Sequence, residues 1–407
     1  MNYYYLFLLP IIILIVILVI FLIYIKIRFK FWASQPVFHV YDFGYMIFPP
    51  GIIDHTLPEK NKYTNFKQIE SLLYEKLSEY KSKQFVNFIK QHYLKKGDNV
   101  FSPKPVNVHP YFTSHTSKSF ISFYHENEFV ADHKNGSLEE FKKIVGVITS
   151  RPVHISIWKK EVKNTMDAYY VDYLCVHDDH RKKGIAPQMI QTHHYYQRHS
   201  NKNSVVGLFK REGELTGIVP ICVYKTYGFS VKKWVKPPEF PAYYTLLEIN
   251  PQNFSSLYDF LKKTAPKYFD IHIHTEITNI IELLKTKNLF IYVLMINHDI
   301  EEIRCAYFFM KSGVFIEKDL EVLTCIGSIN DSTSNIELFT HGFKLSFWKI
   351  AEKNNFGFAA IENISHNHLL IHNLMKKTKP VVISPTAYFF YNFAYPTFSS
   401  NKTWILI

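Results

Sequence analysis

Residues 169–177 read Tyr-Tyr-Val-Asp-Tyr-Leu-Cys-Val-His, and residues 178–187 continue as Asp-Asp-His-Arg-Lys-Lys-Gly-Ile-Ala-Pro. The first stretch is dominated by Tyr, Val, Leu and Cys, which is typical of a half-buried strand. Residues 187–192 contain no glycine and predict a helix, because proline is tolerated in a first helical turn. This succession of strand, basic turn and helix is the feature from which we predict the fold.

The turn between the strand and the helix suits a pyrophosphate. Arg181, Gly184 and Ala186 have the spacing Arg-x-x-Gly-x-Ala. Gly184 allows the backbone to approach a ligand closely. The free amides and the dipole at the start of the helix favour negative charge. A strand that delivers a substrate carbonyl beside such a cradle is what transfer of an acyl group from CoA requires.

The composition of the 407 residues is globular and leaves room for two domains of ordinary size. The net charge of +12 admits a nucleic-acid binder. The lysines are scattered and no nucleic-acid motif accompanies them, so we predict no nucleic-acid partner. A solvated surface that attracts phosphorylated cofactors or anionic lipid explains the charge instead. The four cysteines stand singly in apolar runs, which indicates buried thiols in a reducing compartment.

Two pairs of histidines have spacings that could serve a metal. His272 and His274 share one face of an expected strand, and His368 and His372 are one helical turn apart. Neither pair has a carboxylate or cysteine nearby in sequence that would complete a set of ligands. We therefore interpret these side chains as surface or core histidines and predict no metal site.

The N-terminus differs from the rest of the chain. Residues 1–25 carry no charged side chain, and residues 6–25 are almost wholly apolar, which is enough to span a bilayer core. A cleaved signal peptide would need a basic start and a small-residue cleavage site, and neither is present. Basic residues at 26, 28 and 30 follow the apolar stretch, so the positive-inside rule predicts a single-pass anchor with residues 26–407 on the cytoplasmic side.

Apolar patterning predicts a similar order of elements in two halves, which indicates two related α+β units. A proline-rich stretch at 235–240 separates the halves. In the first half we expect a helix within 66–93, strands within 144–176, a helix at 186–199, and strands at 204–209 and 222–229. In the second half we expect helices near 253–263 and 336–354, and strands near 289–296, 303–310, 320–326, 356–362 and 386–394.

Four stretches carry a resemblance to a known family. They read Phe-Trp-Ala-Ser-Gln-Pro-Val at 31–37, Asp-Tyr-Leu-Cys-Val-His at 172–177, Tyr-Phe-Phe-Tyr-Asn-Phe at 388–393 and Trp-Ile-Leu-Ile at 404–407. In order and spacing they resemble the glycylpeptide N-tetradecanoyltransferases, or N-myristoyltransferases. The resemblance implies an α+β fold of two fused acetyltransferase-like (GNAT) units, with mixed sheets flanked by helices, here preceded by one transmembrane helix.

The resemblance also implies a domain plan and a reaction. Residues 1–27 would be the anchor, 28–238 the acyl-CoA-binding unit, and 239–407 the unit that supplies the peptide site and the C-terminal carboxylate. The protein would transfer a fatty acyl group from an acyl-CoA, with myristoyl-CoA as the expected co-substrate, to the N-terminal glycine amine of a peptide or protein. We expect it to act as a monomer.

The resemblance assigns roles to individual residues. The backbone N–H groups of Tyr173 and Leu174 would hold the thioester oxygen. The C-terminal carboxylate of Ile407 would take a proton from the glycine ammonium, and burial would raise its basicity. The residues on acyl-CoA-binding positions are Lys30, Phe31, Trp32, Tyr173, Leu174, Cys175, Val176, Arg181, Lys182, Gly184, Ile185 and Ala186.

Each assignment has a simpler alternative. Tyr173 and Leu174 could be ordinary strand residues. Phe31 and Trp32 could be interfacial aromatics that flank the membrane span. Ile407 could be the last residue of an edge strand.

The acceptor side departs from the family pattern. The family's acidic Val-Glu-Asp-Asp-Asp-Asn-Met-Phe loop is Leu-Lys-Lys-Gly-Asp-Asn-Val-Phe at 94–101, so a basic peptide would be repelled. The family's Tyr-Thr-Ala-Gly is replaced around 208–213, and its Asn-Ala-Leu-Asp is Ala-Ala-Ile-Glu at 359–362. Two alternative functions therefore stay open: a membrane-tethered acyl-CoA or acyl-peptide binder without catalysis, and a small-molecule N-acetyltransferase.

Overall fold

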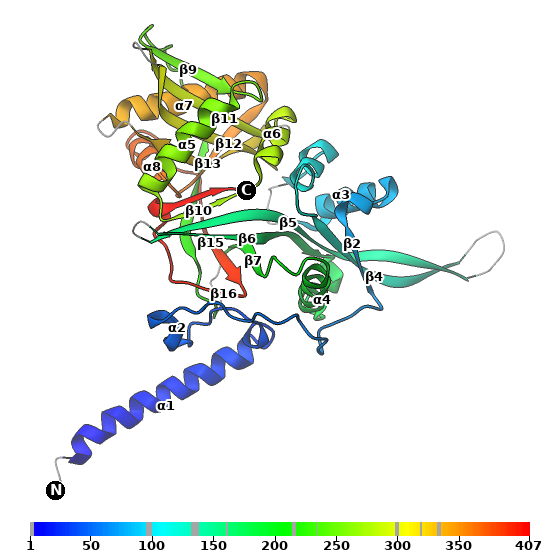
Figure 1. The fold of residues 1–407 in the computed structure, drawn as a ribbon. Helices are drawn as coiled ribbons and strands as arrows, with labels where there is room; N and C mark the ends of the chain where they lie inside the picture. The colour runs from blue at the N-terminus through cyan, green and yellow to red at the C-terminus, as the bar shows by residue number, and fades with distance from the viewer. Residues whose placement is uncertain are drawn as a thin grey trace.

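The computed structural model describes residues 4–94, 100–131, 138–159, 162–213, 217–232, 234–297, 301–317, 320–331 and 335–407. Helix α1 (Tyr4–Arg28) projects away from a folded body (Figure 1). Its Leu8–Arg28 stretch is long and apolar enough to cross a membrane and is hardly buried within the body. This matches the length and composition predicted for the N-terminus.

The body is built on one large sheet. Its strands are β2 (Ile69–Leu73), β3 (Val100–Phe101), β4 (Phe120–Ala131), β5 (Leu138–Lys159), β6 (Val162–Val176), β7 (Val206–Glu212), β8 (Cys222–Ser230), β9 (Tyr244–Ile249), β10 (Ile271–His274), β11 (Leu289–Asn297), β12 (Glu301–Glu317), β13 (Leu320–Asn330), β14 (Phe356–Glu362), β15 (Val382–Tyr391) and β17 (Thr403–Leu406). Their main order is β17-β10-β5-β6-β7-β15-β8-β14-β13-β12-β11-β9. β1 (Gly51–Ile52) and β16 (Phe393–Ala394) form a separate pair.

Helices cover the sheet in both halves (Figure 1). They are α2 (Phe43–Ile47), α3 (Glu79–His92), α4 (Ile185–Ser200), α5 (Phe254–Tyr268), α6 (Ile277–Lys285), α7 (Ile336–Lys353) and α8 (Asn367–Met375). The short 3₁₀ turns are η1 (Trp32–Ser34), η2 (Tyr74–Lys76), η3 (Pro105–Asn107), η4 (His109–Phe112), η5 (Asp178–His180) and η6 (Ser400–Lys402).

The two halves share one topological unit. β6 and β7 are parallel and are joined through α4, while β13 and β14 are parallel and are joined through α7. Parallel neighbours need such a crossover, and a helix normally supplies it. Most other neighbouring strands are antiparallel. The prediction of two related α+β units with mixed sheets is confirmed.

Strands from the end of the chain complete the sheet of the first half. β15 lies between β7 and β8, and β17 pairs in parallel with β10, which pairs with β5. The C-terminus therefore lies in the middle of the molecule, between the two halves (Figure 1). A domain boundary at residue 238 stays a prediction, since the sheet runs through both halves.

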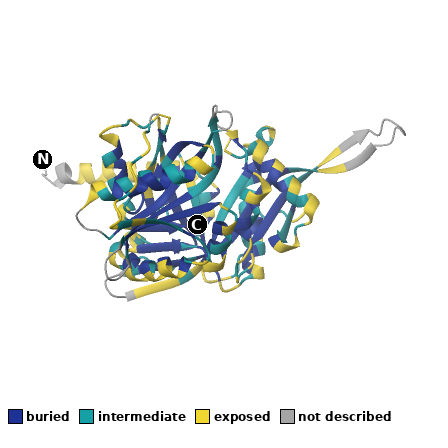
Figure 2. Ribbon diagram, turned by 90° about the horizontal axis from the view of Figure 1, so that it is seen from above, coloured by how far each residue is buried: buried dark blue, intermediate teal, exposed yellow. Residues whose placement is uncertain are grey.

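Aromatic side chains form much of the core, which lies between the sheet and its helices (Figure 2). Phe339, Phe343 and Phe347 follow the four-residue spacing of one helix face, and all three are buried on α7. Tyr307 and Phe309 of β12 stack against this face. Each buried aromatic contributes about 1.5–3 kcal/mol relative to exposure. All four cysteines are buried and free, as predicted from their apolar surroundings.

The prediction of a helix within 66–93 is wrong for its first part. Residues 69–73 form strand β2, which pairs with β4 from Ile69 opposite Tyr124 to Leu73 opposite Phe120. The apolar spacing fits a helix, but pairing with β4 outweighs it. The helix begins only at Glu79, where the Ser78 hydroxyl caps it by accepting a hydrogen bond from the Lys81 N–H. The other elements predicted above are confirmed, within a few residues at most ends, although β12 runs on to Glu317, well past the predicted end at residue 310.

Candidate active site

A β-bulge interrupts the pairing of β5 with β6. Val147 is opposite Cys175 and Thr149 is opposite Asp172, so Tyr173 and Leu174 together face one residue of β5. Tyr173 has a φ of 49°, in the left-handed region that is costly for a residue with a side chain. Bulges disrupt the ladder locally and are common beside active sites. The two proposed oxyanion donors therefore lie at a break in the sheet.

Asp172 controls the backbone at this bulge. Its Oδ1 accepts hydrogen bonds from the Tyr173 N–H at 2.8 Å and from the Tyr93 hydroxyl at 3.3 Å. Its carbonyl oxygen accepts a bond from Thr149 Oγ1 at 2.9 Å. Burial, and then the Asp172 charge, raise the pKa of Tyr93 well above its usual value. Tyr93 therefore remains a donor, and the carboxylate engages one of the N–H groups that an oxyanion would need.

One cavity opens between β6, β7 and α4. It has a volume of about 550 Å³, within the usual range for small-molecule sites. Phe31, Trp32, Leu174 and Ala186 belong to its lining, which is mainly apolar. The Trp32 ring stacks on Phe209 at 5.4 Å between centroids. This cavity can hold an extended apolar chain with its end at the bulge.

A second cavity, of about 920 Å³, is lined by residues from both halves of the chain. We call it the acceptor-side cavity, and it includes strand residues of β12, β13, β14 and β15. Both cavities share a set of lining residues around the bulge. These are Tyr93, Leu94, Tyr170, Asp172, Tyr173, Lys210 and Glu212. The two cavities therefore meet at the bulge.

A buried ion pair forms one wall of the acceptor-side cavity. Lys210 Nζ lies 2.5 Å from Glu362 Oε1, and the Tyr224 hydroxyl donates to Glu362 Oε2 at 3.2 Å. The ammonium also lies 5.8 Å from the centre of the Tyr388 ring. Burial acts to lower the pKa of Lys210, but the Glu362 carboxylate outweighs it and raises that pKa above its usual value. Sequence reasoning noted both segments as departures without pairing these residues, since they are far apart in the chain.

Ile407 belongs to the wall of the same cavity. It follows β17, is buried, and packs in one cluster with Tyr170 and Tyr388. The Thr275 N–H donates to the Leu406 carbonyl oxygen at 3.0 Å and extends the pairing of β17 with β10. Pairing of β17 with β10 thus holds Ile407 beside the acceptor-side cavity.

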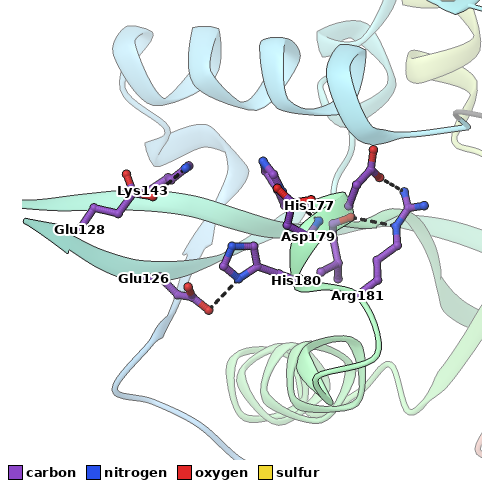
Figure 3. Close-up of polar contacts among 9 residues, drawn as sticks. Glu126, Glu128, Lys143, His177, Asp179, His180 and Arg181 are labelled. Carbon is purple, nitrogen blue, oxygen red and sulfur yellow. Dashed lines mark hydrogen bonds and ion pairs between the residues drawn. The ribbon is translucent and has the colours of Figure 1, made fainter.

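The predicted pyrophosphate cradle lies at the start of α4. Gly184 has a φ of 78° and Lys182 a φ of 64°, and the helix begins at Ile185. The first N–H groups of a helix have no acceptor within it, so they are available to an anion. Arg181 is turned toward its own strand end: its Nη2 is 2.7 Å from Asp178 Oδ1, and its Nε donates to the Val176 carbonyl oxygen at 3.3 Å (Figure 3).

Only part of the predicted acyl-CoA set lines a cavity. The residues that do so are Phe31, Trp32, Tyr173, Leu174 and Ala186. The other seven belong to the described part of the chain and line neither cavity. Of these, Cys175, Val176 and Ile185 are buried in the core, and Lys30, Arg181, Lys182 and Gly184 are exposed.

The stretches at 31–37 and 388–393 contact each other. The Tyr391 hydroxyl donates to Gln35 Oε1 at 2.7 Å, and the Asn392 N–H donates to the Pro36 carbonyl oxygen at 2.6 Å. These bonds hold Phe31 and Trp32 against the first cavity. Residues 95–99, which include the two lysines expected to repel a basic peptide, lie outside the described residues.

Sequence comparison relates part of the chain to one family. The family model of the N-terminal domain of myristoyl-CoA:protein N-myristoyltransferase matches residues 56–209. The glycylpeptide N-tetradecanoyltransferase of Plasmodium falciparum (isolate 3D7) is 26% identical over 171 residues, which cover 41% of this chain. The matched stretch spans only 38% of the length of that relative.

Structural comparison covers more of the chain. A crystal structure of Saccharomyces cerevisiae N-myristoyltransferase with bound myristoyl-CoA superposes with a TM-score of 0.66 at 13% identity, over 91% of this chain and 94% of the yeast chain. A tandem GNAT protein from the clavulanic acid biosynthesis pathway superposes with a TM-score of 0.52 at 12% identity, over 81% of this chain and all of that one. These likenesses show the fold of two acetyltransferase-like units.

Proposed function

We propose that the chain is an N-myristoyltransferase-like enzyme, which its partial sequence match and its fold support, and that it transfers a fatty acyl group from acyl-CoA to an N-terminal glycine amine. The observation that carries this proposal is the meeting of two cavities at one β-bulge. One cavity is apolar and suits an acyl chain, and the other is large enough for part of a peptide. Acyl transfer needs both substrates to reach one carbonyl carbon.

The reaction at the bulge would proceed as follows. The amine nitrogen attacks the thioester carbonyl carbon, and the carbonyl oxygen takes up negative charge. The N–H groups of Tyr173 and Leu174 stabilise this oxygen, which requires the Asp172 carboxylate to release the Tyr173 N–H. The carbon–sulfur bond then breaks, the sulfur of CoA leaves with the bonding electrons, and the second amine proton neutralises it.

The glycine ammonium must first lose a proton to a base. In this proposal the base is the C-terminal carboxylate of Ile407. The buried position of Ile407 in the wall of the acceptor-side cavity supports the role. Burial disfavours a carboxylate anion and so makes it a stronger base.

The co-substrate in this proposal is myristoyl-CoA. Its chain occupies the first cavity, past Phe31 and Trp32, and its phosphates lie at the start of α4, where Gly184 exposes the backbone. Lys30, Arg181 and Lys182 supply positive charge nearby, and Arg181 would exchange Asp178 for a phosphate. Cys175, Val176 and Ile185 shape this region from the core.

We further propose that residues 1–27 anchor the enzyme as a single-pass helix with residues 26–407 in the cytoplasm. A Cβ atom on Gly217 would lie 2.9 Å from Ile25 Cγ2, so the end of α1 packs closely on the body. Phe31 and Trp32 follow within a few residues. The acyl cavity would then lie beside the bilayer. In this scheme residues 28–238 bind acyl-CoA, 239–407 complete the peptide site, and the enzyme acts as a monomer.

The test uses the full chain in detergent with myristoyl-CoA and Gly-initiated peptides of acidic, neutral and basic composition, with the products read by mass spectrometry. Addition of one alanine after Ile407 should abolish transfer while myristoyl-CoA binding persists. Ile407→Val keeps the carboxylate in place and serves as the matched control. Absence of transfer from the unmodified chain to every peptide would overturn the function, and full activity of the extended chain would overturn the role of Ile407.

A further inference from the structure

Arg151 is a buried cation in the wall of the acceptor-side cavity. It lies on β5 opposite Tyr170 of β6, and 3% of the residue is exposed. Its guanidinium carbon lies 4.8 Å from the centre of the Tyr111 ring and 5.1 Å from that of Tyr170. Two aromatic rings thus hold the planar group, and cation–π attraction stabilises its position.

The guanidinium lacks the partners that such a group normally has. Its Nε and Nη1 atoms are buried and make no hydrogen bond. No carboxylate among the described residues forms an ion pair with it, whereas Lys210 in the same cavity is paired with Glu362. An isolated charge away from water costs several kcal/mol unless it is paired. A cavity wall that retains such an unpaired charge is suited to an anionic ligand.

We propose that Arg151 binds a carboxylate of the acceptor, so that the acceptor is a peptide amine with an acidic side chain close to the N-terminal glycine. This inference rests on the proposed acyl transfer. A guanidinium presents donors in a planar fork that matches a carboxylate or a phosphate. Asp172, Glu212 and Glu362 line the same cavity, and they would repel a doubly charged phosphate more than a singly charged carboxylate.

The register of β6 gives the distance between the bulge, where the acceptor amine would lie, and Arg151, where its carboxylate would bind. Tyr170, which is opposite Arg151, precedes the bulge at Tyr173 by three residues. At about 3.3 Å per residue, this corresponds to about 10 Å. An extended peptide with its amine at the bulge would reach Arg151 with the side chain of its second or third residue. An acidic residue at one of these positions is therefore expected to be preferred.

The experiment measures binding and transfer separately. Fluorescent Gly-initiated peptides with Asp at each of the second to sixth positions are titrated onto the full chain saturated with a non-hydrolysable myristoyl-CoA analogue. Each peptide is matched with one that carries Asn at the same position. When the acidic residue is at the second or third position, the unmodified chain should bind the Asp peptide about ten- to a hundredfold more tightly than the matched Asn peptide. This ratio corresponds to a difference in binding free energy of about 1.4–2.8 kcal/mol.

Two variants test whether Arg151 is the residue that causes the preference for Asp peptides. Arg151→Gln should remove the difference between Asp and Asn peptides and leave binding of the Asn peptide within about threefold, as for loss of a single peptide contact. Lys311→Gln removes another cation from the same cavity wall and should keep the Asp preference. Thermal unfolding of both variants verifies that they are folded. The comparison on the unmodified chain needs no variant, so it tests the proposal even if Arg151→Gln does not fold.

Several results would overturn the proposal. Equal binding of Asp and Asn peptides at every position excludes a carboxylate subsite. An Arg151→Gln variant that slows transfer equally for all peptides, with unchanged binding, would show that Arg151 positions the chain's own C-terminal carboxylate instead. A chain that prefers Asp peptides but transfers nothing would overturn the acyl-transfer function while retaining the carboxylate subsite, so the two failures are distinguishable.

Discussion

Replacement of Glu362 by glutamine tests how much the buried ion pair of the acceptor-side cavity contributes to the free energy of unfolding. The Glu362 side chain is 6% exposed and that of Lys210 25% exposed, with 2.5 Å between the charged atoms. Glutamine keeps the size of the side chain and can still accept the Tyr224 hydrogen bond. It leaves the Lys210 ammonium buried without an anion. Removal of one partner of a buried pair costs about 3–5 kcal/mol.

We expect the lower end, about 3 kcal/mol, because a quarter of the Lys210 side chain reaches water. The assay is chemical unfolding of the full chain in detergent at neutral pH, followed by fluorescence and circular dichroism. Glu239→Gln is the matched control, because its pair with Lys349 is largely exposed and should contribute less than about 1 kcal/mol. The double variant Lys210→Met with Glu362→Gln should recover most of the loss, since it leaves no unpaired charge.

The pH dependence has a defined sign. The pKa of Lys210 is raised in the folded chain, so its contribution to stability is complete below the unfolded pKa of about 10.4. The difference between the unmodified chain and Glu362→Gln should therefore be constant through neutral pH and shrink only in strong alkali. A loss below about 1 kcal/mol at neutral pH, or a difference that fades between pH 6 and 8, would refute the reasoning.

Two further changes test the bulge and the cradle. Asp172→Asn removes a charge that holds the Tyr173 N–H and repels a developing oxyanion. The rate of transfer at saturating substrate should therefore rise about three- to tenfold. A fall in this rate would show that the Asp172 carboxylate takes part in proton removal. Gly184→Ala places a side chain at a φ of 78° where no atom lies within 4 Å, so strain alone should cost about 1–2 kcal/mol and weaken CoA binding. Gly213→Ala, with a φ of 91° and the same open space, should show the strain without the loss of CoA affinity.

The fold was largely predictable because its local patterns agree with its tertiary contacts. The strand at 169–177 and the helix after it appear as β6 and α4, and the phenylalanines of α7 follow a helical period. The failure at 69–73 has a physical cause. Those residues have an apolar spacing that suits a helix, and only the pairing of β2 with β4 makes them a strand. A local pattern contains no information about a partner some fifty residues away.

The proposed site could be predicted only where a contiguous motif carries the family resemblance. Tyr173 and Leu174 could be singled out because they lie in such a motif, and the structure places them at a β-bulge, while their role as oxyanion donors stays a prediction. The pairing of Lys210 with Glu362 and the clamping of Arg151 by Tyr111 and Tyr170 could not be predicted. These contacts join segments that lie far apart in the chain and depend on how β5, β6, β7 and β14 are placed in one sheet.

The contrast between the two cavities follows from the substrates proposed for them. An acyl-CoA has fixed chemistry, so backbone N–H groups and apolar walls can bind it, and many side chains are compatible with that arrangement. An acceptor peptide varies, and side-chain charges must distinguish one peptide from another. In this chain Glu362 and Arg151 line the acceptor-side cavity and not the first one, while Lys210, the partner of Glu362, lines both. A change of acceptor would therefore require changes at these charges and leave intact the strand, bulge and helix that we propose for the acyl donor.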